Sequence, residues 1–96
     1  MSRVNISFQI LPVVEEEKIY EVVDKVIDYI DKSGVKYEVS AMETNMEGDF
    51  DQLLNIIKQS QQICVNEGAP RVVSMIKIDY KPEGVTIDEK VKKYRK

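Results

Sequence analysis

The side chains of this sequence that could take part in chemistry are few and mostly acidic. The 96 residues contain 17 Asp and Glu, 14 Lys and Arg, one cysteine and no histidine. Histidine is the usual general base near neutral pH, the commonest zinc ligand and the partner of many nucleophilic Ser and Cys residues. The absence of histidine therefore argues against general acid-base catalysis by this residue, against a typical zinc site and against a Ser-His or Cys-His nucleophile. Glu43 and Lys77 are the groups left for an enzyme to use, and no motif surrounds either, so we expect no catalytic residue.

The single cysteine and the absence of cofactor motifs narrow the possible functions further. Cys64 falls on the apolar side of a predicted helix, which is typical of an inert core thiol. One cysteine cannot form an internal disulfide, so a reducing cytoplasm is the expected location. The first residues lack a signal-peptide pattern, and no apolar stretch approaches the roughly 20 residues that a membrane span needs. No Gly-rich phosphate loop or metal-ligand cluster occurs, so no cofactor or metal is expected.

The charge balance argues mildly against nucleic acid as a partner. The net charge is -3, whereas phosphate backbones attract a basic stripe. The one basic cluster is the tail from Lys90 to Lys96. We interpret this tail as a solvated helix end, where positive charge complements the negative end of the helix dipole.

Hydrophobic periodicity predicts the elements that must position these side chains. Residues Val4 to Leu11 alternate strictly, with Val4, Ile6, Phe8 and Ile10 on one face, which is the pattern of a half-buried strand ended by Pro12. An apolar stripe from Ile19 to Ile30 predicts a helix whose start carries the three glutamates 15–17 and whose end lies near Gly34. The remaining predicted elements are strands 35–40, 43–48 and 72–80, a helix from Asp49 to Gly68 whose stripe includes Phe50, Leu53, Leu54, Ile57, Ser60, Gln61 and Cys64, and a short helix opened by Thr86 and Glu89.

This order of elements predicts the fold class. Two right-handed β-α-β crossovers joined by a hairpin give a ferredoxin-like βαββαβ sandwich of the α+β class. It would consist of a four-stranded antiparallel sheet with two helices on one face, plus a short C-terminal helix. Ninety-six residues leave no room for a second core, so residues 1–96 are expected to form one domain.

The second face of this sheet is predicted to be open, and alternation identifies its residues. Its polar members near strand ends, such as Glu47 and Asp79, are explained by contact with water. Leu11, Val73 and Met75 form an apolar strip among them, which favours self-association through this face. No aromatic residue occupies it, unlike in RNA-recognition domains. The predicted open face comprises Asn5, Ser7, Gln9, Leu11, Glu38, Ser40, Glu43, Asn45, Glu47, Val73, Met75, Lys77 and Asp79.

The sequence also resembles a known family along nearly its whole length. The segments Ile6–Pro12, Lys36–Val39, Met42–Thr44 with Glu47-Gly48, Gly68–Val73, Ile76–Asp79 and Thr86–Val91 are similar to those of the thiamine-binding protein family. The resemblance implies a ferredoxin-like fold, dimers or tetramers built through sheets, and binding of thiamine or its hydroxymethylpyrimidine moiety. It implies a role in thiamine salvage or transport without catalysis and without a metal.

A pocket for such a ligand can be drawn from the open face and the hairpin beside it. An aminopyrimidine requires paired donors and acceptors, which Ser7, Gln9, Thr44 and Asn45 would supply, and a flat ring requires apolar walls such as Met42 and Met75. Glu38 or Glu43 would oppose the cationic thiazolium. Lys77 would pair with a carboxylate across the sheet or favour a phosphorylated ligand. The predicted ligand-binding residues are Ser7, Gln9, Glu38, Met42, Glu43, Thr44, Asn45, Met75 and Lys77.

Two alternatives stay open from the sequence. The first is a structural or regulatory homo-oligomerising module without a small ligand. The second is an enzyme acting on a pyrimidine or a phosphate ester, which the lack of histidine disfavours.

Overall fold

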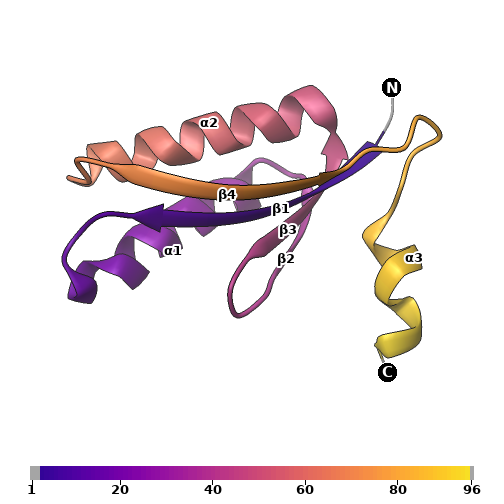
Figure 1. The fold of residues 1–96 in the computed structure, drawn as a ribbon, viewed down its shortest axis with the longest axis horizontal. Helices are drawn as coiled ribbons and strands as arrows, with labels where there is room; N and C mark the ends of the chain where they lie inside the picture. Colours follow the sequence, from indigo (N-terminus) through magenta and orange to yellow (C-terminus); the bar gives the residue numbers. More distant parts are fainter. Residues whose placement is uncertain (1–2, 96) are drawn as a thin grey trace.

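The computed structural model describes residues 3–95 and confirms the predicted order of elements. One antiparallel sheet contains all four strands in the order β2-β3-β1-β4 (Figure 1). The fold is therefore the predicted ferredoxin-like α+β sandwich. Its elements are β1 (Arg3–Pro12), α1 (Glu16–Lys32), β2 (Lys36–Val39), β3 (Thr44–Asp49), α2 (Phe50–Asn66), β4 (Val72–Asp79), α3 (Ile87–Val91) and a 3-10 turn, η1 (Lys92–Tyr94).

The alternation of β1 sets the two faces of the sheet, because paired residues on neighbouring strands share a face. Ile6 lies opposite Met46 on β3 and Ile78 on β4. Ser7, one residue later, lies opposite Asn45 and Lys77, and these three side chains therefore share the other face. The register thus places the predicted open-face residues of β1, β3 and β4 together.

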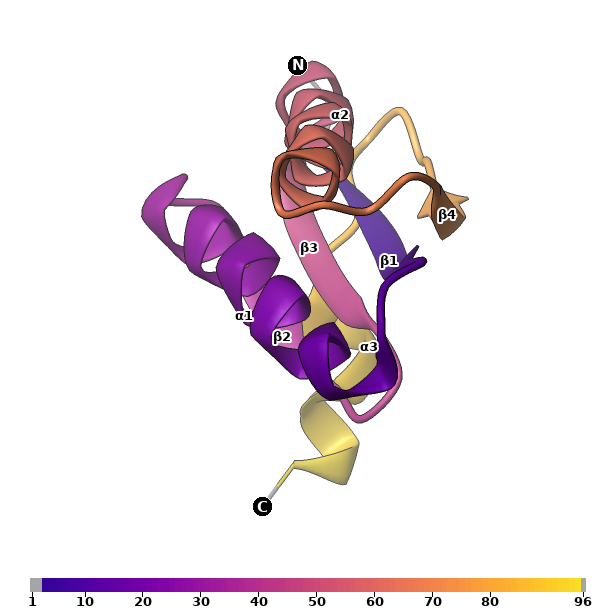
Figure 2. The same ribbon diagram turned by 90° about the vertical axis from the view of Figure 1, so that its left-hand side faces the viewer.

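Helices α1 and α2 cover the first face (Figure 2), and their apolar stripes form the core. Val22, Val26 and Ile30 are buried on α1, as the spacing predicts. The α2 stripe differs from the prediction at one point. Ile56 is buried and Leu54 is 38 % exposed, since Ile56 is spaced three residues from Leu53 and four from Ser60, in line with the buried positions.

The two outer strands are less well covered than the two inner ones. Val39, which the alternation predicts to point inward, is 53 % exposed because it ends the short edge strand β2. On the other edge, the helix-facing Ile76 and Ile78 of β4 are 41 % and 45 % exposed. Strand β4 therefore presents apolar side chains on both of its faces.

The open face is not uniformly open, which corrects the sequence-based expectation. After β4 the chain turns through residues 81–84, where Gly84 takes a φ of 97° and its N–H donates to the Lys81 carbonyl oxygen at 2.7 Å. Helix α3 then lies apart from α1 and α2, at the end of the sheet where β1 begins and β4 ends (Figure 1). It covers that end of the second face, so Glu47 is 4 % exposed instead of solvated.

The basic tail is also only partly solvated. Lys90 and Arg95 form ion pairs with carboxylates of the sheet, contrary to the expectation of a solvated helix end. Lys92 and Lys93 are exposed as predicted, and Lys96 lies outside the described residues. Within residues 3–95, neither long helix has the length and apolar character that a membrane crossing requires.

Candidate ligand-binding site

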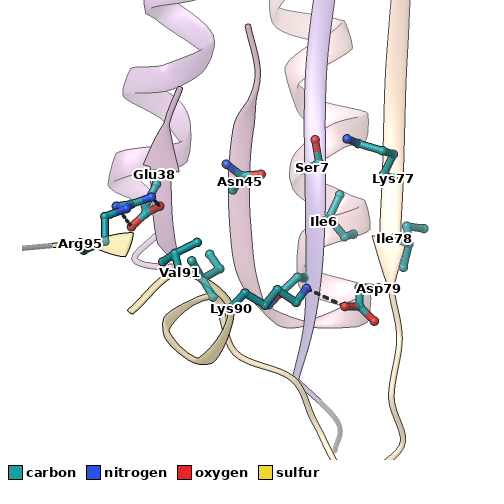
Figure 3. A pocket seen from close by; sticks show the side chains of 12 residues that line it. Ile6, Ser7, Glu38, Asn45, Lys77, Ile78, Asp79, Lys90, Val91 and Arg95 are labelled. Atoms are coloured by element: carbon teal, nitrogen blue, oxygen red, sulfur yellow. Dashed lines mark hydrogen bonds and ion pairs between the residues drawn. The ribbon is translucent and has the colours of Figure 1, made fainter. Parts of the chain in front are cut away.

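A cavity of about 300 Å³ lies where the C-terminal segment, residues 85–95, meets the second face of the sheet. We call it the C-terminal cavity. Figure 3 shows its side chains converging from the strands and from α3. Its volume is at the lower end of the range for small-molecule pockets. It is lined by Asn5, Ile6, Ser7, Glu38, Asn45, Lys77, Ile78, Asp79, Ile87, Lys90, Val91 and Arg95.

The sheet supplies the neutral hydrogen-bonding groups of this cavity. Ser7 and Asn45 are register partners on β1 and β3, and their side chains lie next to each other (Figure 3). Both are half-buried. Asn45 Nδ2 is 3.4 Å from Ser40 Oγ, a long hydrogen bond on an exposed edge. The Asn45 amide and the Ser7 hydroxyl, side by side on neighbouring strands, together offer both donors and acceptors to a flat polar ring.

Two ion pairs close the other side of the C-terminal cavity. The guanidinium of Arg95 donates to both carboxylate oxygens of Glu38, at 3.0 and 3.1 Å. Lys90 Nζ lies 2.6 Å from Asp79 Oδ2. Each pair joins the C-terminal segment to an edge strand, Glu38 on β2 and Asp79 on β4 (Figure 3).

A third charged group bridges the strands farther along the face. Ser7 Oγ donates a hydrogen bond to Glu43, and Lys77 Nζ lies 3.6 Å from the same carboxylate oxygen. The hydrogen bond from Ser7, followed by the attraction of Lys77, lowers the pKa of Glu43 below its ordinary value. Lys77 therefore pairs with a carboxylate across the sheet, which is the first of the two roles predicted for it from the sequence.

Buried contacts hold the start of the C-terminal segment in place. Val85 and Ile87 are 7 % and 5 % exposed. The Val85 N–H donates to the Arg3 carbonyl oxygen at 3.1 Å, and the Ile87 N–H donates to Glu47 Oε1 at 2.6 Å. Asn5 Nδ2 donates to the Val85 carbonyl oxygen at 3.3 Å. The polar residues Asn5 and Glu47 are thus buried because they bind the backbone of this segment.

A second cavity, of about 310 Å³, lies at the opposite end of β1, and we call it the hairpin cavity. Pairing of β1 with β3 stops at Phe8, whereas its pairing with β4 continues to Pro12. The space beside the unpaired stretch of β1 is bounded by α1 and by residues 40–43 of the β2–β3 hairpin. It is lined by Phe8, Gln9, Ile10, Leu11, Ile19, Tyr20, Val23, Val26, Ile27, Ile30, Val39, Ser40, Ala41, Met42, Glu43 and Thr44.

The predicted ligand-binding residues divide between these two cavities. Ser7, Glu38, Asn45 and Lys77 line the C-terminal cavity. Gln9, Met42, Glu43 and Thr44 line the hairpin cavity instead, with Thr44 buried opposite Phe8 on the helix-covered side of the sheet. Met75 lies on the second face opposite Gln9 and lines neither cavity.

Sequence reasoning missed the contribution of the C-terminal segment to the site. Ile87, Lys90, Val91 and Arg95 form one wall of the C-terminal cavity. A signal for this wall was present: the apolar Val85 and Ile87 need a surface to cover, and the basic tail is complementary to carboxylates of the open face.

The cysteine adds no reactive group to either cavity. Cys64 is fully buried on α2. Burial raises the pKa of its thiol, which stays protonated at neutral pH.

Fold and site together define a small α+β domain with a polar cavity between its sheet and a C-terminal helix. The family model described as thiamine-binding protein matches residues 6–95. The chain belongs to the thiamine-binding protein family. It is 63 % identical over 95 residues to a UPF0045 protein of Clostridium perfringens, covering 99 % of this chain and 100 % of that protein.

Solved structures agree with this assignment. A Bacillus cereus domain of unknown function, DUF77, superposes with a TM-score of 0.92 at 52 % identity, over 98 % of this chain and 91 % of that one. A Thermotoga maritima protein described as a candidate thiamine biosynthesis/salvage protein superposes with a TM-score of 0.89 at 39 % identity, over 97 % and 99 %. The family is thus one named for binding and is not a recognised enzyme family.

Proposed function

We propose that this protein binds thiamine or its hydroxymethylpyrimidine moiety in the C-terminal cavity and catalyses no reaction. Membership of the thiamine-binding protein family supports thiamine or its pyrimidine moiety as the ligand. The observation that carries the choice of site is the pairing of Ser7 and Asn45 on the floor of a cavity that also holds two carboxylates. A role in salvage or transport in the cytoplasm would follow.

The groups of the cavity suit the two halves of such a ligand. An aminopyrimidine has adjacent donors and acceptors that match the Asn45 amide and the Ser7 hydroxyl. The thiazolium of thiamine carries a permanent positive charge, and Glu38 and Asp79 are the carboxylates that face the same space. The aliphatic side chains of Ile87 and Val91 supply apolar wall.

Isothermal titration calorimetry with thiamine and with hydroxymethylpyrimidine tests the proposal directly. We expect saturable heat and a rise in melting temperature with at least one of them, since a ligand that binds only the folded state stabilises it. Absence of both signals at millimolar ligand would exclude the proposal. Chromatography of the ligand after prolonged incubation tests catalysis, and we expect it to be recovered unchanged.

Self-association is the second property that we propose, and the exposed apolar residues of the sheet support it. The register places Leu11 opposite Val73 and Gln9 opposite Met75, so the predicted apolar strip lies on one face. Leu11 and Val73 are each 42 % exposed and Met75 is 58 % exposed. This strip lies at the end of the face that the C-terminal segment leaves uncovered, which suits contact with a second copy of the chain.

Substitution of Met75 by glutamate tests this surface. The wild-type protein should elute as a dimer or tetramer in size-exclusion chromatography with light scattering, and Met75→Glu should shift it toward the monomer. Val65→Glu is the matched control, because Val65 is 49 % exposed on α2 and lies away from the sheet. A monomeric wild type, or equal effects of the two variants, would refute this interface. An oligomer that gives no heat with either ligand would instead favour an assembly module without a small ligand.

A further inference from the structure

The two ion pairs of the C-terminal cavity share one property that bears on ligand choice. In each pair the carboxylate belongs to the sheet and lines the cavity, while the cation belongs to the C-terminal segment. Glu38 is held by Arg95 in a bidentate pair, and Asp79 by Lys90. The protein's own cations thus neutralise the carboxylates that would oppose a positively charged ligand.

We propose that Arg95 and Lys90 act as internal competitors of a cationic ligand, so that these two pairs determine the charge of the ligand that the C-terminal cavity accepts. The inference rests on the proposed function and extends it. With both pairs formed, the cavity favours a neutral pyrimidine. With a pair opened, its carboxylate becomes free to contact the thiazolium of thiamine.

The C-terminal segment is built to open at one end only. Its start is fixed by buried Val85 and Ile87 and by backbone hydrogen bonds to Arg3 and Glu47. Its far end has no comparable anchor, because Tyr94 is 71 % exposed and the Arg95 side chain is 58 % exposed. Exposed ion pairs contribute little to stability and weaken with salt. The far end, which carries Arg95, can therefore separate from the sheet while α3, which carries Lys90, stays attached. As a result, the Arg95–Glu38 pair opens more readily than the Lys90–Asp79 pair.

Lys77 does not replace these competitors, because it already faces a carboxylate of its own. Its Nζ lies 3.6 Å from Glu43, which also accepts the hydrogen bond from Ser7. Removal of Arg95 or Lys90 therefore makes the net charge of the cavity more negative. We expect a phosphorylated thiamine, whose phosphate adds about -1.5 to -2 charges near pH 7, to respond in the opposite direction from thiamine.

The test compares affinities for thiamine, hydroxymethylpyrimidine and thiamine monophosphate in wild type and in Arg95→Ala. The ratio of the thiamine to the hydroxymethylpyrimidine association constant should rise by up to about fivefold, the upper end of the range expected for one exposed charge pair. The ratio of the thiamine monophosphate to the hydroxymethylpyrimidine association constant should fall. Because any general loss of the cavity wall affects all three ligands, the ratios isolate the effect of charge.

Matched variants separate this role from a structural one. Arg95→Lys keeps the charge and should restore the wild-type ratio. Lys92→Ala removes an equal charge from an exposed position of the same segment that does not line the cavity, and should leave the ratio unchanged. Glu38→Gln should lower the ratio in place of raising it. Unchanged ratios in Arg95→Ala, or an equal rise in Lys92→Ala, would overturn the inference.

Hydrogen exchange of the ligand-free protein tests the opening step independently of the titrations. Backbone amides of residues 92–95 should exchange faster in 1 M than in 20 mM NaCl, whereas those of Val85 and Ile87 should not. Salt-independent exchange at 92–95 would refute the opening step even if thiamine binds. If wild type binds none of the three ligands, the proposed function fails, and with it the ligand-selecting role, whatever the exchange data show.

Discussion

The two ends of β1 border cavities of nearly equal volume, about 300 and 310 Å³, but of different chemical character. At one end, the C-terminal segment brings cations onto a polar surface and pairs them with carboxylates. At the other end, β1 extends beyond its pairing with β3, and the hairpin cavity there is lined mainly by apolar side chains of α1, β1 and the hairpin. The same alternating strand thus builds a charged site where a late segment covers it and an apolar site where a neighbouring strand stops short.

The largest expected difference between the two ends is in stability. Ile87→Ala removes a side chain that is 5 % exposed and anchors the C-terminal segment. We expect it to lower the free energy of unfolding by about 2–3 kcal/mol, as for other buried large-to-small changes. Met42→Ala, at the rim of the hairpin cavity and 74 % exposed, should cost less than about 0.5 kcal/mol. Urea denaturation of both variants measures the difference, and equal midpoints would mean that the segment is not part of the cooperative fold.

Ligand affinity decides which of the two cavities is used. Asn45→Ala removes an amide from the C-terminal cavity and should weaken binding by up to about tenfold, the loss of one hydrogen bond. Gln9→Ala removes an amide from the hairpin cavity and should change the affinity less than about twofold. Asn55→Ala, on the exposed surface of α2, is the control for both. Calorimetry that gave the reverse order would move the site to the hairpin.

The smallest effect concerns pH and the group between the two cavities. The pKa of Glu43 is lower in the folded protein than its ordinary value of 4.5. The ionised carboxylate therefore stabilises the fold at pH values above about 4.5. This contribution is lost as the pH falls from about 4.5 through the lowered pKa. Glu43→Gln should therefore reduce the melting temperature slightly at pH 7 and by progressively less toward pH 3. A constant difference between the two proteins over this range would contradict the assignment.

The fold could be predicted because the information for it is local. The alternation of β1, the stripes of α1 and α2 and the glycines that end the helices each fix one element, and the order of elements leaves few topologies. Even the membership of the second face follows from period two, since Ser7, Asn45 and Lys77 were predicted together and are register partners.

The candidate site was only half predictable because it depends on contacts between distant parts of the chain. Arg95 meets Glu38 across 57 positions, and the Ile87 backbone meets Glu47 across 40. No periodicity relates such pairs. Likewise, the division of the predicted residues between two cavities depends on β3 ending its pairing at Phe8, which the sequence of β1 alone does not reveal.

The turn before the C-terminal segment has a consequence for how this site can diverge among relatives. Residues 81–83 are exposed, and Gly84 adopts a backbone conformation that other residues rarely accept. An added or lost residue in this turn would displace one wall of the C-terminal cavity while leaving every strand pairing and the helical core untouched. Ligand preference can therefore evolve through the length of a loop that does not itself line the cavity.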